Sequence, residues 1–322
     1  MPPPLKIAVE PDLGLDVEWG LNDMASSKWR PYFTEAVLQG GGEVAPPSAA
    51  NALIWLDNGD SGGLVEVLDR YPAIAWVQLP WAGVETFYQS GLFDRPVRFT
   101  CAKGAYGEQV GEHALTLTLA CLRHLVEQGR HLSWHPKEPE SLFGRRVARL
   151  GAGGIAITYV RLLQPFGCQI TALRRQAEPL PGADQTLTLA HLHSVLPQTE
   201  VLVLALALTP QTRRIIGARE LALLPPGAVV INVARGGHID TQALVASLRS
   251  GHLAAAGLDV TDPEPLPDDH PLWQMNNVLI TSHCADSVGW CVRQLAERGR
   301  ENVTRFAQNQ PLIGLVDPQA GY

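Results

Sequence analysis

Three polar side chains stand where apolar stretches of the chain end, and together they have the chemistry for hydride transfer to a 2-keto acid. Arg235 follows "VVINVA", Glu264 lies in "LDVTDPEP", and His283 ends "NVLITSH". A guanidinium can bind both oxygens of a carboxylate with its planar fork. An imidazolium can protonate the carbonyl oxygen, and a neighbouring carboxylate raises the pKa of that imidazole and orients it. Arg235, His283 and Glu264 are the candidates for these roles. Taken alone, Arg235 is more simply a surface charge, His283 a structural histidine and Glu264 part of a turn.

A glycine-rich turn earlier in the chain indicates a dinucleotide site. "LGAGGIA" places Gly151, Gly153 and Ala156 in a G-x-G-x-x-A pattern, after the segment "RRVARL" and before the helical pattern "AITYVRLLQPFG". Strand, turn and helix in this order form the setting in which a helix N-terminus binds a pyrophosphate. The alternative is an ordinary tight turn of an α/β sheet. Arg149, a charge inside the strand, has no explanation from the sequence.

The next apolar segment ends in two arginines, Arg174 and Arg175, within "TALRRQ". In dinucleotide-binding units this strand end usually carries one acidic residue, which binds the ribose hydroxyls of NAD. Two guanidinium groups instead match the 2′-phosphate of NADP. The pair predicts that NADP(H) is the preferred cofactor and NAD(H) a possible one, unless both arginines are simply solvated.

The elements that must position these residues alternate between strand and helix, which predicts parallel sheets in an α/β fold. Strands are expected at "LKIAVE", "NALIWL" and "IAWVQLP", and six more from "RRVARL" to "NVLITSH". We predict two doubly wound domains. A substrate domain comprises residues 1–102 plus 285–322, and a dinucleotide-binding domain, residues 103–284, is inserted into it. The polar residues then follow the carboxyl ends of strands, where open parallel sheets bind ligands.

One segment differs from this alternation. "GEQVGEHALTLTLACLRHLVEQG", residues 107–129, reads as one long helix with small or apolar residues on most sides. Such a helix must be buried, either between domains or between subunits.

The totals exclude several classes of function. The net charge of -7 gives no overall basic field for nucleic acid or anionic lipid, and the longest apolar run, "VLVLALAL", is too short to cross a bilayer. The five cysteines are scattered without a CxxC pair, which favours reduced thiols and a cytoplasmic protein. No metal site is expected. The reactivity of Cys284, beside His283, stays open.

Several motifs resemble the signatures of the D-isomer-specific 2-hydroxyacid dehydrogenases, most closely the glyoxylate/hydroxypyruvate reductase branch. They are "VGEHAL", "LGAGGIA", "ALTPQTRRIIG", "NVARGG", "LDVTDPEPLPDDHPLW" and "NVLITSH", and the likeness spans about residues 74–283. The resemblance implies an NAD(P)-dependent enzyme that reduces a small 2-keto acid to the D-2-hydroxy acid. It also implies a Rossmann-like cofactor domain inserted into a flavodoxin-like substrate domain, with the active site in the cleft between them. A homodimer would form through the helix near residues 107–129.

The same resemblance assigns site residues. The catalytic set would be Arg235, Glu264 and His283. The substrate-binding residues would be Trp55, Trp81, Ala82, Gly83 and Val84, the last three through backbone N–H groups of "PWAGVE"; core packing is an equal alternative for Trp55. The cofactor-binding residues would be Val110, Gly151, Gly153, Gly154, Ile155, Arg174, Arg175, Leu206, Ala207, Thr212, Val233, Ala234, Arg235, Asp259 and His283. Trp134 is a candidate for the partner subunit's active site.

The chain departs from the family pattern at a few positions. Ser282 stands where proline is usual, Asp286 where glycine or alanine is usual, and Ala156 where a third glycine is common. These departures and Arg149 leave open an alternative, a weakly active or non-enzymatic dinucleotide-sensing protein of the same fold, similar to a corepressor. The natural 2-keto acid is also left open, because the pocket depends on loops that the sequence does not place.

Overall fold

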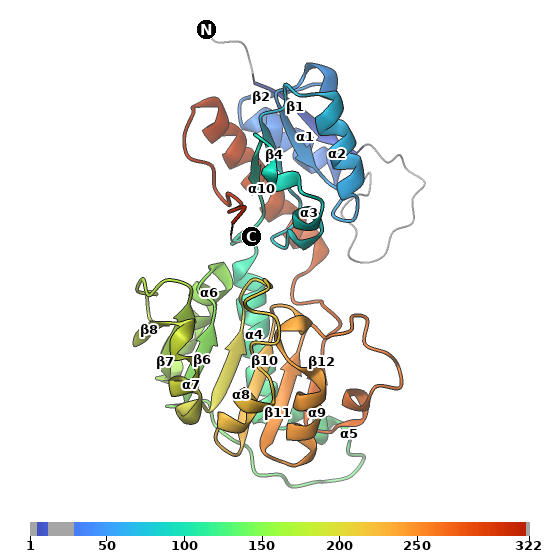
Figure 1. Cartoon of the computed structure of the whole chain (residues 1–322). Coiled ribbons are helices and arrows are strands. Elements are labelled where there is room, and N and C mark those ends of the chain that lie inside the picture. Colours follow the sequence, from blue (N-terminus) through green and yellow to red (C-terminus); the bar gives the residue numbers. More distant parts are fainter. Residues whose placement is uncertain (1–4, 12–28, 320–322) are drawn as a thin grey trace. The chain divides into compact units, whose positions relative to one another are not determined.

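A computed structural model of the chain describes residues 5–11 and 29–319. The chain divides into two compact units (Figure 1). One unit is Met1–Tyr106 together with Ser287–Tyr322, and the other is Gly107–Asp286. Within the described residues, no helix is both long enough and apolar enough to cross a bilayer.

The first unit is a parallel sheet with helices on both faces. In sheet order, its described strands are β2 (Gly42–Val44), β1 (Leu5–Glu10), β3 (Ala52–Trp55), β4 (Trp76–Gln78) and β5 (Arg98–Thr100). Its described helices are α1 (Arg30–Gln39), α2 (Ser61–Arg70), α3 (Glu85–Gln89) and α10 (Val288–Ala307), with 3-10 turns η1 (Pro47–Ala49) and η2 (Leu92–Asp94). Apolar side chains of α1 and α10 bury one face of the sheet, and those of α2 and α3 bury the other. This strand order is flavodoxin-like.

The second unit contains the larger parallel sheet. In sheet order, its strands are β12 (Val278–Ile280), β11 (Leu253–Leu258), β10 (Ala228–Asn232), β9 (Val201–Leu204), β6 (Arg146–Leu150), β7 (Gln169–Arg174) and β8 (Gln185–Thr188). The chain runs from β6 outward to β8 and then returns to β9 on the other side of β6. The strand order therefore reverses between β6 and β9, which is the point where Rossmann-type sheets bind dinucleotides.

Helices cover both faces of this sheet. They are α4 (Gly107–Leu122), α5 (Leu125–Arg130), α6 (Gly154–Leu163), α7 (Leu192–Val195), α8 (Ala218–Leu223) and α9 (Thr241–Arg249), with 3-10 turns η3 (Gln164–Phe166), η4 (Leu189–His191), η5 (Leu196–Gln198), η6 (Gly236–His238) and η7 (Pro271–Gln274). Leucines of α7, α8 and α9 join one apolar cluster with the strands. On the other face α4 packs against α6 so closely that a Cβ on Gly111 would lie 2.7 Å from Thr158 Cγ2.

The predicted fold class is confirmed, and the structure corrects several of its elements. β2, β5 and β8 were not predicted, because each is short and polar residues interrupt its apolar pattern; β8 reads "QTLT". The helix expected over residues 107–129 is two helices. His124 adopts left-handed backbone angles, φ 53° and ψ 36°, between α4 and α5, and this conformation ends the first helix and starts the second.

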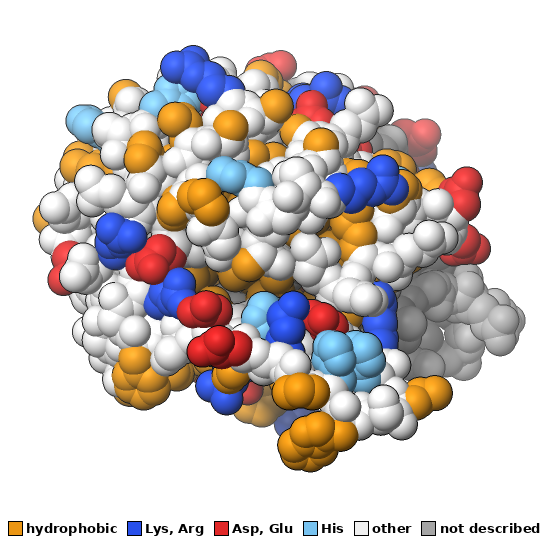
Figure 2. All heavy atoms as spheres, turned by 90° about the horizontal axis from the view of Figure 1, so that it is seen from below, with side chains coloured by type: hydrophobic (Ala, Val, Ile, Leu, Met, Phe, Trp, Pro, Cys, Tyr) orange, Lys and Arg blue, Asp and Glu red, His pale blue; other side chains and the backbone are white. Residues whose placement is uncertain are grey.

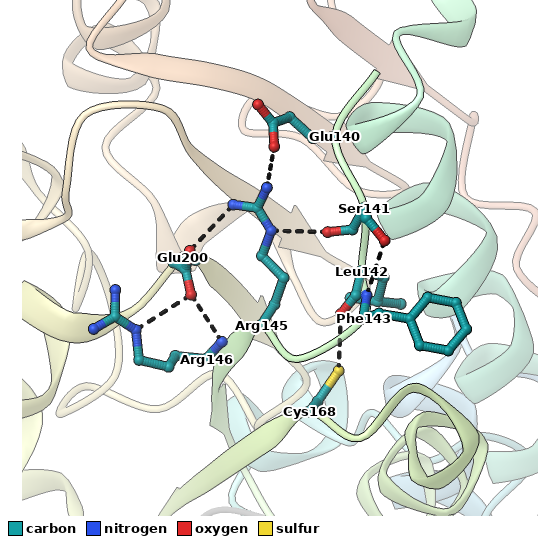
Figure 3. Close-up of polar contacts among 8 residues, drawn as sticks. All are labelled: Glu140, Ser141, Leu142, Phe143, Arg145, Arg146, Cys168 and Glu200. Carbon is teal, nitrogen blue, oxygen red and sulfur yellow. Dashed lines mark hydrogen bonds and ion pairs between the residues drawn. The ribbon is translucent and has the colours of Figure 1, made fainter. Parts of the chain in front are cut away.

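A polar network ties the segment that follows α5 to the starts of the neighbouring central strands β6 and β9 (Figure 3). Arg145 contacts Glu140, the Ser141 carbonyl oxygen and Glu200, while the Nε of Arg146 donates to Glu200 Oε2 across 3.2 Å. The backbone N–H of Glu140 also donates to the Leu122 carbonyl oxygen at 2.9 Å. The long loop that leaves α5 is therefore fastened where it returns to β6.

Candidate active site

His283 and Glu264 form a hydrogen-bonded pair in the segments that follow the neighbouring strands β12 and β11. His283 Nδ1 donates to Glu264 Oε1 across 2.6 Å, and the two side chains are 40% and 39% exposed. The backbone of His283 has φ 51°, in the left-handed region that non-glycine residues seldom adopt. Because Nδ1 is bound to the carboxylate, Nε2 is the ring nitrogen left to act on a substrate.

The pair shifts the pKa of both groups in opposite directions. The hydrogen bond to Glu264 raises the pKa of His283, against the smaller opposing effects of partial burial and of the positive charge on Arg235. Burial alone would raise the pKa of Glu264, but the hydrogen bond and charge of His283, with further help from Thr261 N–H and Arg235, lower it. The arrangement thus favours imidazolium beside carboxylate, which is the state that a proton donor needs.

Asp259 is buried beside this pair, and one of its carboxylate oxygens is engaged with donors. Its Oδ1 accepts hydrogen bonds from Thr281 Oγ1 at 2.8 Å and from the backbone N–H of Cys284 at 3.0 Å. His113 of α4 lies 2.8 Å from Thr281 Oγ1 and 3.4 Å from Asp259 Oδ1, both measured from Nε2. Burial would raise the pKa of Asp259, but these donors outweigh burial and lower it. His113 and Thr281 were not singled out from the sequence, although both lie in the motifs "VGEHAL" and "NVLITSH".

Arg235 follows β10 in a turn that Asn232 holds in shape. Asn232 is buried, its Nδ2 donates to the Arg235 carbonyl oxygen at 2.9 Å, and its Oδ1 accepts from Ala234 N–H at 3.0 Å. Gly236 then passes so close to the next loop that a Cβ there would lie 1.9 Å from the Thr261 carbonyl carbon. The Arg235 guanidinium is partly exposed, and its charge influences both Glu264 and His283. Arg235, Glu264 and His283 therefore belong to one site.

The glycine turn has the form that a pyrophosphate requires. Gly151 has φ 103°, and a Cβ there would lie 2.1 Å from the Ala205 carbonyl oxygen, so this position accepts glycine alone. Gly153 is the N-cap of α6, and it has no side chain with which to cap the N–H groups of this first turn. A Cβ on Gly153 would meet no described atom within 4 Å. The open helix N-terminus fits an anionic group with close access to the backbone.

The two arginines at the end of β7 differ in their surroundings. Arg174 is partly buried, its Nη2 lies 3.2 Å from Glu178 Oε2, and its Nη1 donates to the Glu178 carbonyl oxygen at 3.1 Å. Arg175 is exposed. The sequence pattern did not reveal Glu178 as a partner of Arg174, because an acidic residue in an exposed loop has many possible neighbours.

The remaining predicted cofactor residues line turns beside the glycine loop or lie nearby in the second unit. Thr212 Oγ1 donates to the Ala207 carbonyl oxygen at 2.7 Å and accepts from Thr209 N–H at 2.8 Å, which closes the turn after β9. His238 is buried, with ring nitrogens 3.0 Å and 3.1 Å from the carbonyl oxygens of Thr212 and Leu206. Val110, Val233 and Ala234 are also buried. His238 was missed because a histidine in "GGHID" could equally face solvent.

The predicted substrate residues all lie in the first unit. Trp55 is 2% exposed in the core, and its Nε1 has no hydrogen-bond partner among the described residues. Trp81 packs edge-on against Tyr106, with ring centroids 6.3 Å apart. The backbone N–H of Ala82 donates to Tyr106 Oη at 2.8 Å, so this N–H is engaged within the unit. Val84 is buried and Gly83 is partly exposed.

The second unit is Rossmann-type, and its glycine turn leaves the N-terminus of α6 uncapped. Arg235 and the His283–Glu264 pair follow its strands. Together these features define the class of the protein, a nicotinamide-dinucleotide-dependent dehydrogenase. Residues 115–285 match the family model described as "D-isomer specific 2-hydroxyacid dehydrogenase, NAD binding domain". The chain belongs to this family, and it is an NAD(P)-dependent 2-hydroxyacid dehydrogenase. The family that the sequence motifs resembled is thereby confirmed.

Three known proteins illustrate the likeness. Glyoxylate/hydroxypyruvate reductase A of Salmonella newport is 33% identical over 222 residues, covering 67% of this chain and 70% of that protein. A D-isomer specific 2-hydroxyacid dehydrogenase from Xanthobacter autotrophicus Py2, solved with NADPH and MES, superposes with a TM-score of 0.81 at 28% identity, covering 99% of this chain and 100% of that one. The NADPH-dependent glyoxylate/hydroxypyruvate reductase of Sinorhizobium meliloti, solved with NADP and sulfate, gives a TM-score of 0.78 at 26% identity, covering 99% and 100%.

Proposed function

We propose that this protein is an NADPH-dependent reductase of small 2-keto acids, with glyoxylate and hydroxypyruvate as the first candidates, and that it forms the D-2-hydroxy acid. The observation that carries the proposal is the 2.6 Å hydrogen bond between His283 Nδ1 and Glu264 Oε1, with the charge of Arg235 acting on both. The names of the Salmonella and Sinorhizobium relatives support the substrate class.

Each residue of the set has a separate task in this reaction. The reduced nicotinamide, when bound, supplies the hydride that attacks the carbonyl carbon. His283 donates its Nε2 proton to the carbonyl oxygen, and Glu264 keeps that imidazole charged and oriented. Arg235 binds the substrate carboxylate, and its positive charge stabilises the negative charge that develops on the substrate. Asp259, held in its ionised form by Thr281 and Cys284 N–H, would accept a hydrogen bond from the carboxamide of the cofactor.

The preference for NADPH rests on the end of β7. Arg174 stands at the position from which an acidic residue would bind the ribose hydroxyls of NAD, and Arg175 adds a second donor. A 2′-phosphate would take the place of the Glu178 carboxylate as a partner of Arg174. The pyrophosphate would lie on the N-terminus of α6, beside Gly151, Gly153, Gly154 and Ile155.

The test is a panel of steady-state assays with the full chain. NADPH oxidation is followed with glyoxylate, hydroxypyruvate and phenylpyruvate in turn. The chirality of the product is determined for hydroxypyruvate and phenylpyruvate, because the glycolate formed from glyoxylate is achiral. We expect turnover with at least one of the two smaller acids, and a D product from each acid whose product is chiral. No turnover with any of them, combined with unimpaired NADPH binding, would support a dinucleotide-sensing protein instead.

We also propose a homodimer that uses the segment of α4 and α5, in a cytoplasmic protein. Support comes from large apolar side chains exposed on and after α5, namely Leu125, Leu132, Trp134 and Phe143. Sedimentation velocity of the wild-type chain and of Trp134→Ser tests the dimer. A monomer at micromolar concentration in both would contradict it.

A further inference from the structure

Two histidines and a glutamate gather on the segment that follows α4, in a part of the second unit that the reaction above does not use. Glu127 lies in α5, His131 is the C-cap residue of that helix, and His135 lies in the loop beyond. Their candidate ligand atoms all lie within 4.8 Å of one another. Figure 2 shows histidine side chains exposed among acidic and basic ones on the face seen from below.

The geometry of the helix and the loop brings the three side chains together. Glu127 and His131 are four residues apart, which places them on the same side of one helical turn. The chain then turns back, so that the ring of His135 stacks on that of His131 with centroids 3.6 Å apart and planes at 14°. His135 Nε2 lies 3.5 Å from Glu127 Oε1. The sequence spacing E-x3-H-x3-H alone did not predict this return, and no metal site was expected.

Polar contacts hold both ends of this segment. Arg130, at the end of α5, donates to the carbonyl oxygens of Trp273 and Met275 at 3.2 Å and 3.1 Å, and to Asn276 Oδ1 at 3.0 Å. The other end of the loop is fastened through Arg145 and Glu140, as Figure 3 shows. Ligands on a segment held at both ends lose less conformational entropy when they bind an ion.

We propose that Glu127, His131 and His135 form a binding site for a divalent transition-metal ion of the zinc class. Two imidazole nitrogens and one carboxylate oxygen are a donor set that Zn²⁺ accepts, with a fourth position left for water. Mg²⁺ and Ca²⁺ prefer all-oxygen sets and should not compete. This site uses none of the residues proposed for the dehydrogenase reaction, and it lies on the segment proposed above for the dimer.

Binding requires one imidazole ring to turn and the ligand atoms to move closer together. Zinc bonds of about 2.0–2.2 Å need ligand atoms roughly 3.3–3.5 Å apart in a tetrahedral site. The exposed ring of His131 can turn out of its stack toward the ion. Glu127 can offer Oε1, which already faces His135, while its Oε2 keeps the contact with Lys137 Nζ at 3.0 Å.

The test is isothermal titration calorimetry, in which ZnCl2 is titrated into tag-free, chelator-treated full-length protein. We expect one ion per chain at micromolar or lower Kd, and a loss of at least tenfold in affinity for His131→Ala, His135→Ala and Glu127→Gln. His193→Ala is the matched control, because His193 forms a 2.7 Å pair with Glu220 outside this cluster; its affinity for zinc should equal that of the wild type. MgCl2 should give no saturable heat.

Two results would overturn the site. One is the absence of saturable zinc binding by the wild-type protein. The other is an unchanged zinc affinity in both histidine variants, which would place the ion elsewhere. Circular dichroism of each variant checks that the fold is intact, and a failure of the keto-acid assays above would leave this result untouched.

Discussion

Arg174 at the end of β7 forms a bidentate contact with Glu178, through Glu178 Oε2 at 3.2 Å and the Glu178 carbonyl oxygen at 3.1 Å. The guanidinium proposed to bind the 2′-phosphate of NADP therefore already has an acidic partner four residues along the chain. Glu178 is well exposed, so the pair itself adds little to stability. Its importance is that a bound phosphate must displace or share this contact.

The first prediction concerns cofactor choice. The wild-type protein should prefer NADPH to NADH by at least about tenfold in Kd, or roughly 1.4 kcal/mol. Arg174→Asp with Arg175→Ala should reverse the preference, and Glu178→Gln should strengthen NADPH binding, because it removes a competing negative charge. Fluorescence titration measures each Kd. NADPH affinity should also fall more steeply with salt than NADH affinity.

A matched control and a contrary outcome complete this test. Arg161→Ala removes an arginine on α6 that pairs with Glu108 at 3.0 Å, and it should leave the preference unchanged. Equal affinity of the wild-type protein for both cofactors would leave the two arginines without a function.

The second prediction concerns the proton donor. His283→Ala should lower kcat for keto-acid reduction by about 10²–10⁴-fold. The Kd for cofactor should stay nearly unchanged, because the proton is donated in the transition state. Stopped-flow single-turnover rates separate this step from product release. If turnover is equal in variant and parent, another group is the acid.

The third prediction is a change in the pH profile of Glu264→Gln. Reduction needs the imidazolium, so activity is present at low pH and is lost as pH rises through the pKa of His283. The carboxylate raises that pKa, and its loss should move the decline in kcat/KM to lower pH. An unmoved profile would show that Glu264 does not control the protonation of His283.

The fourth prediction concerns Arg149, which is fully buried in β6. Its Nη1 donates to the Gly151 carbonyl oxygen, while Nε and Nη2 have no partner in the described part of the chain. Burial lowers the pKa of Arg149 to about 9. Arg149→Met should therefore increase the free energy of unfolding at pH 7 by about 1–3 kcal/mol, because it removes an uncompensated buried charge.

The pH dependence of unfolding distinguishes this explanation from better packing. A depressed folded-state pKa means that the unfolded chain binds more protons above pH 9, so wild-type stability should rise there relative to the variant. Arg145→Met is the contrasting control, since it breaks contacts with Glu140 and Glu200 and should destabilise the fold. Urea unfolding of the wild type, Arg149→Met and Arg145→Met measures these differences in stability. A lower stability of Arg149→Met than of the wild type would mean that the buried charge of Arg149 is compensated.

The sequence predicted the parts of the structure that depend on local pattern. The alternation of apolar segments gave the parallel strands, and the glycine spacing gave the turn before α6. The partners of individual side chains could not be predicted. His113 approaches Asp259 only because α4 packs on the sheet, and the pairing of Arg174 with Glu178 depends on the path of a loop. The break at His124 was missed because its neighbours in "CLRHLVE" are all compatible with a helix.

Two glycines of the loop before α6, Gly151 and Gly153, differ in what constrains them. At Gly151 the protein's own backbone forbids a larger residue, whereas at Gly153 no described atom would touch a Cβ. A library randomised at both positions and selected only for folding should return glycine at 151 but alanine or serine as well at 153. Selected for dinucleotide binding, it should return glycine at both. Under the proposed function, the bound ligand would constrain position 153, whereas the fold alone constrains position 151.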